Sequence, residues 1–392
     1  MRVFHFCPVD FYDVNGKIYF GEKAFTPQGG GIQKGRYIER YDLMNCQNTQ
    51  REDTRYISLL SVASCFAVVL MHTNGCFWSF SATERYWKTA NIIESIFYFA
   101  VPVFFMISGA TLVDYSDRYS TKIFFTKRIK KTVIPFVVWS LIGIVFSCLV
   151  LKTVDPADVG KKFIINSVLD ASVVSYYWFF PSLFCVYLCM PLFTAVEKSK
   201  RKSSFTYLVI AGYFINALIP FLKKLFSLDV SFPISVYVAS NYLVFVAMGY
   251  LLSHYDCTRK QKVCIYVMSS IALLAHIVGT YILSMEAGTS IRTFKNVAIS
   301  LPYASGIFLF LKTHGNRIMD GIAGKIVNFL KQYTFSIYLL HWFVIKGLNC
   351  MFTFHTKSML YRLGMPFVVF PICVVLTMIL RKIPIVKHIV PQ

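Results

Sequence analysis

The sequence predicts an all-α integral membrane protein, a bundle of about ten transmembrane helices with both termini in the cytoplasm. Composition, the length of the apolar runs and the distribution of basic residues predict this class. The 392 residues are 56% hydrophobic and only 15% charged, whereas average soluble proteins are about 45–50% apolar and about 25% charged. This balance excludes an ordinary soluble enzyme of two or three domains, and the recurring apolar runs exclude a disordered chain.

Ten apolar runs after Arg55 are long enough to cross a bilayer, which takes roughly 20 residues each. We place them near 56–75, 92–114, 133–151, 173–196, 204–222, 233–253, 263–284, 296–312, 333–350 and 362–380. Several contain Pro or Gly, which membrane helices tolerate. Buried strands of a soluble protein are excluded because the runs are too long.

The charge balance is strongly basic, with 40 Lys and Arg against 19 Asp and Glu. A soluble protein with this balance would suggest a nucleic-acid partner, but the cytoplasmic loops of membrane proteins also collect basic residues. With the N-terminus inside, the loops predicted to be cytoplasmic hold 27 of the 40 basic residues. We therefore expect the lipid bilayer as a partner and no nucleic acid. An odd number of spans would break the alternation.

Three regions are expected along the chain. Residues 1–55 are polar and turn-rich and predict a poorly ordered cytoplasmic extension, residues 56–385 form the transmembrane domain, and residues 386–392 form a short cytoplasmic tail. The eleven cysteines include no CxxC pair, which is neither a zinc pattern nor a disulfide framework. No ligand spacing for a metal occurs, so we expect no metal cofactor.

Ionisable groups inside predicted spans are costly and are therefore functional candidates. His72 ends the first span, about 24 Å along the helix from Tyr56, in the outer part of the bilayer. A histidine there can accept a proton from a hydroxyl. Alternatively, it is a structural residue at the interface that forms a hydrogen bond to a neighbouring helix. His341 is about 10 Å into its own span from the inner face, so we expect it at a different depth from His72. The remaining candidates are Glu94, His276, Asp114, Glu197 and Glu286.

A basic cluster precedes the third span on the side predicted to be cytoplasmic, in FFTKRIKKTVIPFVVWS (124–140). Lys127, Arg128 and Lys131 could hold a phosphate-rich ligand through the arginine fork and the lysine charges. The same cluster could bind lipid headgroups or fix the topology.

Two further segments have both a structural and a functional interpretation. The small pair Ser108–Gly109 lets helices approach closely or lets a thin ligand pass between them. Trp178 lies among aromatic residues near the outer interface. These residues are either part of an aromatic belt or a platform on which a sugar stacks.

Taken together, the segments resemble the acyltransferase 3 family of integral membrane acyltransferases. Five motifs occur in the family's order over about 56–385: VVLMH (68–72), VPVFFMISG (101–109), KRIKKTVIPFVVW (127–139), WFFPSL (178–183) and SIYLLH (336–341). Each motif alone is weak, but the ordered set on ten predicted spans is specific.

The resemblance implies that an acyl group, usually acetyl, passes from cytoplasmic acyl-CoA to a hydroxyl of an envelope sugar or lipid-linked glycan. It also implies a multi-pass location in the cytoplasmic membrane of a bacterium. His72 would correspond to the essential histidine and Arg128 to the basic motif beside acyl-CoA. With this interpretation we assign Lys127, Lys131, Ser108 and Gly109 to the acyl-CoA site. We assign Trp178, Tyr338 and His341 to the acceptor site.

The chain departs from the family in the first helix, where Asp and Arg usually precede the histidine. Ser58 and Ser61 occupy those two positions. A divergent active site, an inactive relative and a compensating residue elsewhere are all open. From a different functional class, a transporter or flippase of lipid-linked or anionic solutes would also have basic loops and about ten spans.

Overall fold

The computed structural model describes the backbone of residues 40–239 and 241–391, and the side chains from residue 55 onward except at 240, 241 and 392. The chain divides into two compact units, residues 1–49 and 50–392. The fold described below is that of the second unit. The N-terminal extension expected over 1–55 lies outside the described residues as far as position 39.

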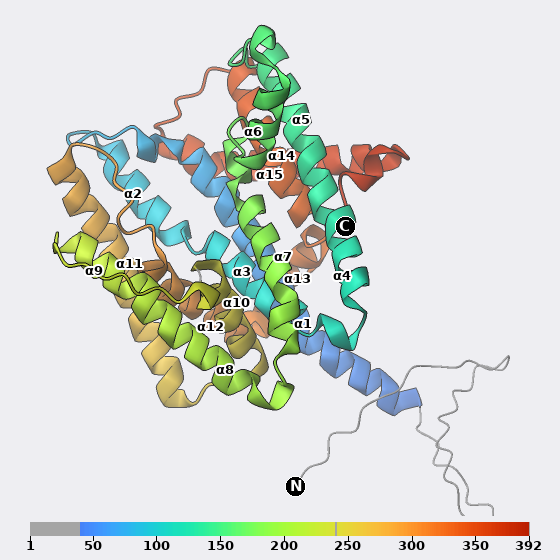
Figure 1. Ribbon diagram of the computed structural model, residues 1–392. Coiled ribbons are helices and arrows are strands. Elements are labelled where there is room, and N and C mark those ends of the chain that lie inside the picture. Colours follow the sequence, from blue (N-terminus) through green and yellow to red (C-terminus); the bar gives the residue numbers. More distant parts are fainter. Residues whose placement is uncertain (1–39, 240, 392) are drawn as a thin grey trace, which may run out of the picture. The chain divides into compact units, whose positions relative to one another are not determined.

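The described residues are helical throughout and contain no strand (Figure 1). The α-helices are α1 (Arg40–Thr73), α2 (Arg85–Phe97), α3 (Ala100–Leu112), α4 (Thr121–Arg128), α5 (Ile134–Leu149), α6 (Lys161–Leu169), α7 (Phe179–Ala195), α8 (Lys198–Ala211), α9 (Ile219–Leu225), α10 (Asn241–His254), α11 (Arg259–Ala287), α12 (Val297–Met319), α13 (Ile322–Leu330), α14 (Thr334–Met351) and α15 (Met359–Lys382). Short 3-10 and π segments join several of them, and three matter below: η1 (Gly75–Trp78), η3 (Ile129–Val133) and η5 (Ser175–Trp178).

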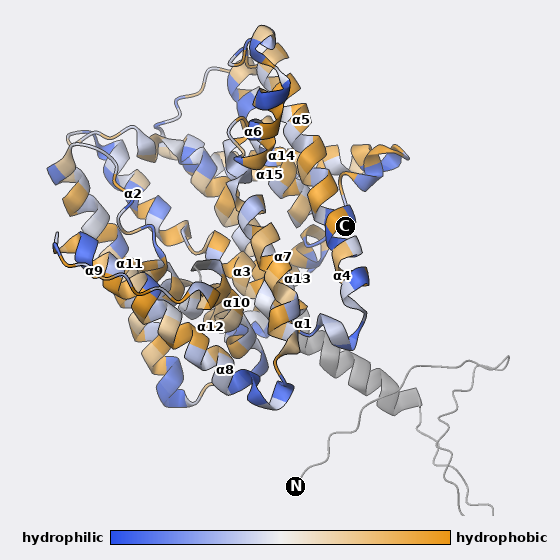
Figure 2. Cartoon of the chain, in the orientation of Figure 1, coloured by the Kyte–Doolittle hydropathy of each residue, from blue (hydrophilic) through white to orange (hydrophobic). Residues whose placement is uncertain are grey.

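Seven helical segments of the described chain are long and apolar enough to cross a membrane. They are Arg55–Thr73, Arg85–Asp117, Thr121–Leu149, Ser175–Ala195, Lys198–Leu225, Arg259–Ala287 and Met359–Lys382. Apolar residues line most of their length, and hydrophilic residues gather near helix ends such as the start of α8 (Figure 2). The protein is therefore an all-helical protein with several candidate membrane spans, which confirms the predicted fold class in this coarser form.

The other three predicted spans coincide with α10, which is shorter than the seven, and with α12 and α14, which are long enough but less apolar than the seven. Buried polar side chains account for part of this in α12 and α14, for example Ser300, Ser305 and His341. A helix surrounded by other helices needs no apolar surface toward lipid, so hydropathy is a weaker guide to such helices.

Helices α3 and α10 lie side by side in the centre of the second unit (Figure 1). Two glycines allow this contact. A Cβ atom on Gly109 would lie 1.9 Å from the backbone oxygen of Val246, and one on Gly249 would lie 2.1 Å from that of Met106. Small residues let membrane helices approach until their backbones touch. The pair therefore fixes the distance between α3 and α10.

Helix α11 has clear local signals at both ends. Thr258 and Gln261 form a capping box at its N-terminus, which satisfies backbone N–H groups that have no partner within the helix. The helix ends where Gly288 adopts a φ of 63°, a left-handed conformation that glycine adopts at no steric cost. This glycine starts the loop that leads to Lys295.

Candidate active site

Three aromatic rings from distant parts of the sequence form a stack at the end of α1. His72 in the last turn of α1 lies against Tyr176 of η5, with ring centroids 3.4 Å apart and planes 14° from parallel. The ring of His341, from α14, lies 5.2 Å from His72 and 5.4 Å from Tyr176. We call these three residues the His72 cluster.

The His341 ring is oriented by its own helix. Its Nδ1 atom lies 2.7 Å from the carbonyl oxygen of Tyr338 and 3.2 Å from that of Ile337. Because carbonyls only accept hydrogen bonds, Nδ1 carries the proton and Nε2 of the neutral ring is an acceptor. That Nε2 is buried and has no hydrogen-bond partner among the described residues. Buried polar atoms normally have partners, so an unpaired imidazole nitrogen marks a place where a proton or a hydroxyl can bind.

The proximity of the two histidines shows that the expectation of different depths was wrong. That expectation assumed that both spans begin at one membrane face. In the structure α14 begins partway along α1, because Thr334 lies 3.4 Å from both Ser61 and Cys65. Counting seven residues onward from Thr334 brings His341 to the level of His72. The same contact places the Ser61 hydroxyl, where the family has Arg, against the hydroxyl of Thr334.

The turn that follows His72 is held from α2 and α15. Thr73 donates to the carbonyl of Arg362, and Asn74 donates to that of Ala90, each at 2.9 Å. The Arg362 guanidinium, only 1% exposed, donates to Thr89 Oγ1 at 2.9 Å and to Asn74 Oδ1 at 3.4 Å. No hydrogen bond within the described part of the chain uses either ring nitrogen of His72. The side chains of the next two residues thus hold the turn after His72 in place, while the imidazole nitrogens of His72 stay available.

The two aromatic residues assigned to the acceptor site take different positions. Tyr338 is buried and donates through its hydroxyl to the carbonyl of Tyr176 at 2.8 Å, so it supports the ring that stacks on His72. Trp178, two residues after Tyr176, keeps 45% of its surface exposed.

Cys76, near His72 in sequence, is a poor candidate nucleophile, because burial raises the pKa of its thiol and the reactive form is the thiolate.

A buried ion pair lies beside this cluster. Lys295, in the loop before α12, binds Glu94 of α2, and both side chains are at most 10% exposed. The Lys295 ammonium also lies 4.4 Å from the ring centroid of Trp78 and 4.7 Å from that of Phe77, within the range of cation–π attraction. Of the two partners, only Glu94 was a candidate from sequence, because Lys295 fell in a predicted loop.

The predicted donor-binding residues lie farther along the bundle. Arg128, at the end of α4, lies 5.5 Å from the ring centroids of Phe124 and Tyr187. Tyr187 is eleven residues beyond Tyr176, or about 16 Å along the helix axis at the usual rise. The structure therefore places the Arg128 region and the His72 cluster at separate levels of the bundle.

The neighbours of Arg128 are held differently. Lys127 lies over the ring of Tyr119, 3.9 Å from the centroid, and Lys131 is on the exposed surface of η3. The Arg128 Nε atom is buried, and no residue that the structure describes accepts a hydrogen bond from it. Ser108 donates to the carbonyl of Phe104 in its own helix, while Gly109 packs against α10. Of this small pair, Gly109 therefore makes the close contact between α3 and α10, while Ser108 bonds within α3.

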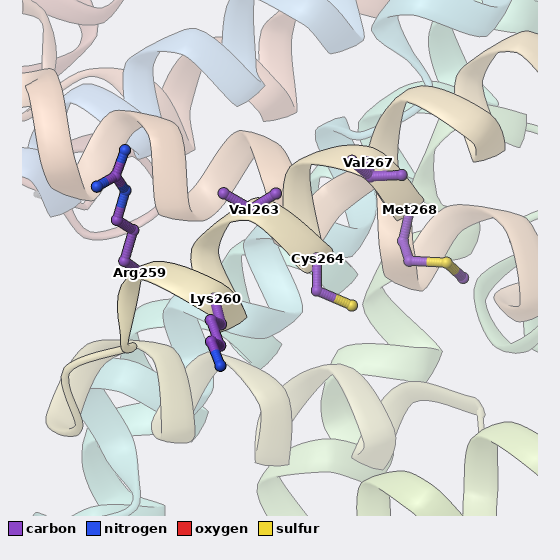
Figure 3. A pocket seen from close by; sticks show the side chains of 6 residues that line it. All are labelled: Arg259, Lys260, Val263, Cys264, Val267 and Met268. Carbon is purple, nitrogen blue, oxygen red and sulfur yellow. The ribbon is translucent and has the colours of Figure 1, made fainter.

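A groove of about 450 Å³ lies on α11, lined by Arg259, Lys260, Val263, Cys264, Val267 and Met268. These residues form two rows with a spacing of four, and each row begins with a basic residue (Figure 3). None of the residues of the His72 cluster lines it. Within the described residues, no group of three or more His, Cys, Asp or Glu side chains could hold a metal ion.

Comparison with known proteins identifies the family. A family model described as an acyltransferase domain, that of acyltransferase 3, matches residues 55–380, which is most of the chain. No curated protein and no solved structure matches the chain. The family match covers the His72 cluster, the buried ion pair and the Arg128 region. The chain therefore belongs to the acyltransferase 3 family, and it is a membrane acyltransferase.

Proposed function

We propose that the protein is an O-acyltransferase that moves an acetyl group from acetyl-CoA to a hydroxyl of an envelope polysaccharide or lipid-linked glycan. The observation that carries this proposal is the His72 cluster. An imidazole with available nitrogens lies beside a second imidazole whose Nε2 is buried and unpaired. Acyl transfer to a hydroxyl needs a base at the acceptor oxygen, and His72 is the less buried member of this pair.

In the reaction, His72 takes the proton of the acceptor hydroxyl as its oxygen attacks the thioester carbonyl. The tetrahedral intermediate then expels the CoA sulfur, which takes up a proton, and the acetyl ester remains on the acceptor. A second route has the His72 nitrogen attack the thioester first, so that the acyl group rests on the imidazole before the hydroxyl takes it. Trapping an acyl-histidine would select the second route. In either route, the unpaired His341 Nε2 is placed to accept a proton.

The Arg128 region is the proposed site for the phosphates of CoA. Arg128 is held between two aromatic rings with an unpaired buried Nε, and Lys127 and Lys131 are close to it in sequence. Stacked arginine keeps its in-plane donors for phosphate oxygens. The long, thin arm of the cofactor would then bring the thioester up the bundle to His72. The proposed chemistry uses acyl-CoA as co-substrate and no metal.

The proposed topology follows from the separation of these two regions. With about ten spans and both termini in the cytoplasm, the Arg128 region faces the cytoplasm, where acetyl-CoA is made. The His72 cluster then lies toward the outer face of a bacterial inner membrane, where envelope glycans are exposed. The excess of basic residues in the loops on the Arg128 side supports this orientation. Two observations favour an acyltransferase over a transporter or flippase. The family's motifs occur in order, and the described bundle has no series of ion pairs running through it.

The decisive experiment measures transfer of labelled acetyl from acetyl-CoA to envelope glycan by membranes that contain the protein. His72→Ala is expected to lower the rate by about 10²–10⁴-fold, the usual contribution of a general base. The matched control is His314→Ala, because the interactions given for the His314 ring are with Phe310 of its own helix, through the carbonyl and the ring of that residue. Its rate is expected to equal that of the wild type.

Two outcomes would contradict the proposal. Transfer that persists unchanged in His72→Ala, with normal membrane insertion, would remove His72 from the reaction. A wild-type protein that transfers nothing would favour the inactive relative that Ser58 and Ser61 leave open. Ser61 contacts only a hydroxyl at the position where the family has Arg, so this second outcome has a definite structural cause.

A further inference from the structure

Four basic side chains lie around the turn that follows His72: Lys295, Arg292, Arg362 and Lys357, which lies over the ring of Tyr86. A carboxylate neutralises one of them. Lys295 binds Glu94. Arg292 and Arg362 form no ion pair with any carboxylate among the described residues. A local excess of positive charge, partly buried, is unusual because uncompensated buried charge is costly. This excess of positive charge therefore suggests that an anionic group binds beside the turn.

Arg362 is the buried part of this excess. It is 1% exposed, and its side-chain hydrogen bonds go to neutral groups: Asn74 Oδ1, Thr89 Oγ1 and the carbonyls of Tyr86 and Ser358. Arginine stays protonated under ordinary conditions. Its charge therefore acts on the turn after His72 through a medium that screens it less than water does.

Arg292 is the exposed part. Its guanidinium carbon lies 4.5 Å from the ring centroid of Trp78, which itself keeps 45% of its surface exposed. Trp78 follows His72 by six residues and ends η1. An arginine stacked on an aromatic ring keeps its in-plane N–H donors, which match the geometry of carboxylate and phosphate. No described residue accepts a hydrogen bond from these donors.

The loop that carries Arg292 is held in place before any ligand binds. Gly288 turns the chain at the end of α11. Ser290 then donates to the carbonyl of Phe77, and the backbone N–H of Ile291 donates to Ser284 Oγ. The indole N–H of Trp87 also binds Ser290 and the Phe77 carbonyl. Preorganisation of this kind lowers the cost of binding.

We propose that the acceptor is anionic: a glycan whose carboxylate or phosphate binds the Arg292–Trp78 pair while its hydroxyl lies at His72. Arg362 contributes the positive potential that attracts such an acceptor to the site. The inference rests on the proposed function and adds the chemical class of the acceptor. Trp78 supplies the ring over which the Arg292 guanidinium lies, and Arg292 binds the anionic group of the acceptor.

The test separates envelope glycans by anion exchange into neutral and acidic fractions and measures acetyl transfer to each. The wild type is expected to acetylate the acidic fraction preferentially. Arg292→Gln is expected to raise KM for that fraction about tenfold, equivalent to about 1.4 kcal/mol, with kcat little changed. Arg292→Lys keeps the charge but loses the planar guanidinium that binds an anion through two N–H groups. Its KM should lie between those of the wild type and Arg292→Gln. Lys202→Gln is the matched control, since Lys202 also lies over an aromatic ring, that of Tyr255, away from the turn after His72, and it should behave as the wild type.

Two treatments of the acidic fraction identify the anion: phosphatase removes phosphate monoesters, and chemical reduction converts carboxylates to alcohols. The treatment that abolishes the preference for the acidic fraction identifies the anionic group that Arg292 binds. Equal or better transfer to the neutral fraction would overturn the inference and leave the proposed function standing. An acidic preference that survives in Arg292→Gln would overturn the role of Arg292. No transfer to either fraction would overturn the proposed function and the inference with it.

Discussion

At the residue scale, the site contains charged side chains whose burial costs free energy unless a partner of opposite charge lies beside them. Glu94 and Lys295 come from α2 and from the loop before α12, and they meet beside the rings of Phe77 and Trp78. Removing one partner of a buried pair leaves the other charge without compensation. The pair therefore ties the loop that carries Arg292 to the helix that follows the His72 turn.

Lys295→Met is expected to lower the free energy of unfolding in detergent micelles by about 3–5 kcal/mol, because Glu94 stays buried without a partner. The double variant Glu94→Gln with Lys295→Met removes both charges and should be less destabilised than the single one. Denaturant unfolding followed by tryptophan fluorescence measures both. Lys200→Ala, which breaks an exposed pair with Glu197, is the control and should unfold like the wild type. A double variant less stable than Lys295→Met would show that the charges are not coupled.

At the element scale, contacts between helices set the positions of the catalytic candidates. Helix α14 begins beside the middle of α1, and this offset brings His341 level with His72. Helices α3 and α10 touch through Gly109 and Gly249. Because η5 leads directly into α7, the stack of Tyr176 on His72 depends on where α7 packs.

Gly109→Ala is expected to destabilise the fold by at least the usual cost of overpacking, about 1–3 kcal/mol. The added carbon would meet a backbone atom of α10, which cannot rotate away. Folded yield and the thermal unfolding midpoint in detergent measure the effect. Gly75→Ala is the matched control near the active site, because nothing lies within 4 Å of the added carbon. Equal midpoints for the two variants would show that α3 and α10 can separate without cost.

At the scale of the whole molecule, the proposed reaction uses two regions at different levels of one bundle. Tyr187 beside Arg128 and Tyr176 of the His72 cluster are about 16 Å apart along η5 and α7. This arrangement suits a donor that enters from one side of the membrane and an acceptor that binds from the other. The direction in which the bundle crosses the membrane decides from which side the proposed donor, acetyl-CoA, would enter.

Reporter fusions test this orientation. Green fluorescent protein fused to residue 392 is expected to fluoresce, because the tail is predicted to be cytoplasmic. Alkaline phosphatase fused after Gly160 is expected to be active, because its disulfides form only outside the cytoplasm and this loop is predicted to be outside. An active phosphatase fused at residue 392 would require an odd number of spans if the N-terminus is inside. The reverse pattern at both sites would invert the proposed direction of transfer.

The sequence by itself determined the membrane class, the helical content and the family, because apolar runs and ordered motifs are local features. It also singled out His72, His341, Arg128 and Glu94 as individual residues. Only the tertiary structure decided which of these meet. The offset between α1 and α14, the stack of Tyr176 on His72 and the loop that brings Lys295 to Glu94 depend on how helices pack. Such packing is set by contacts between residues far apart in the chain, for which the spacing along a single helix carries no signal.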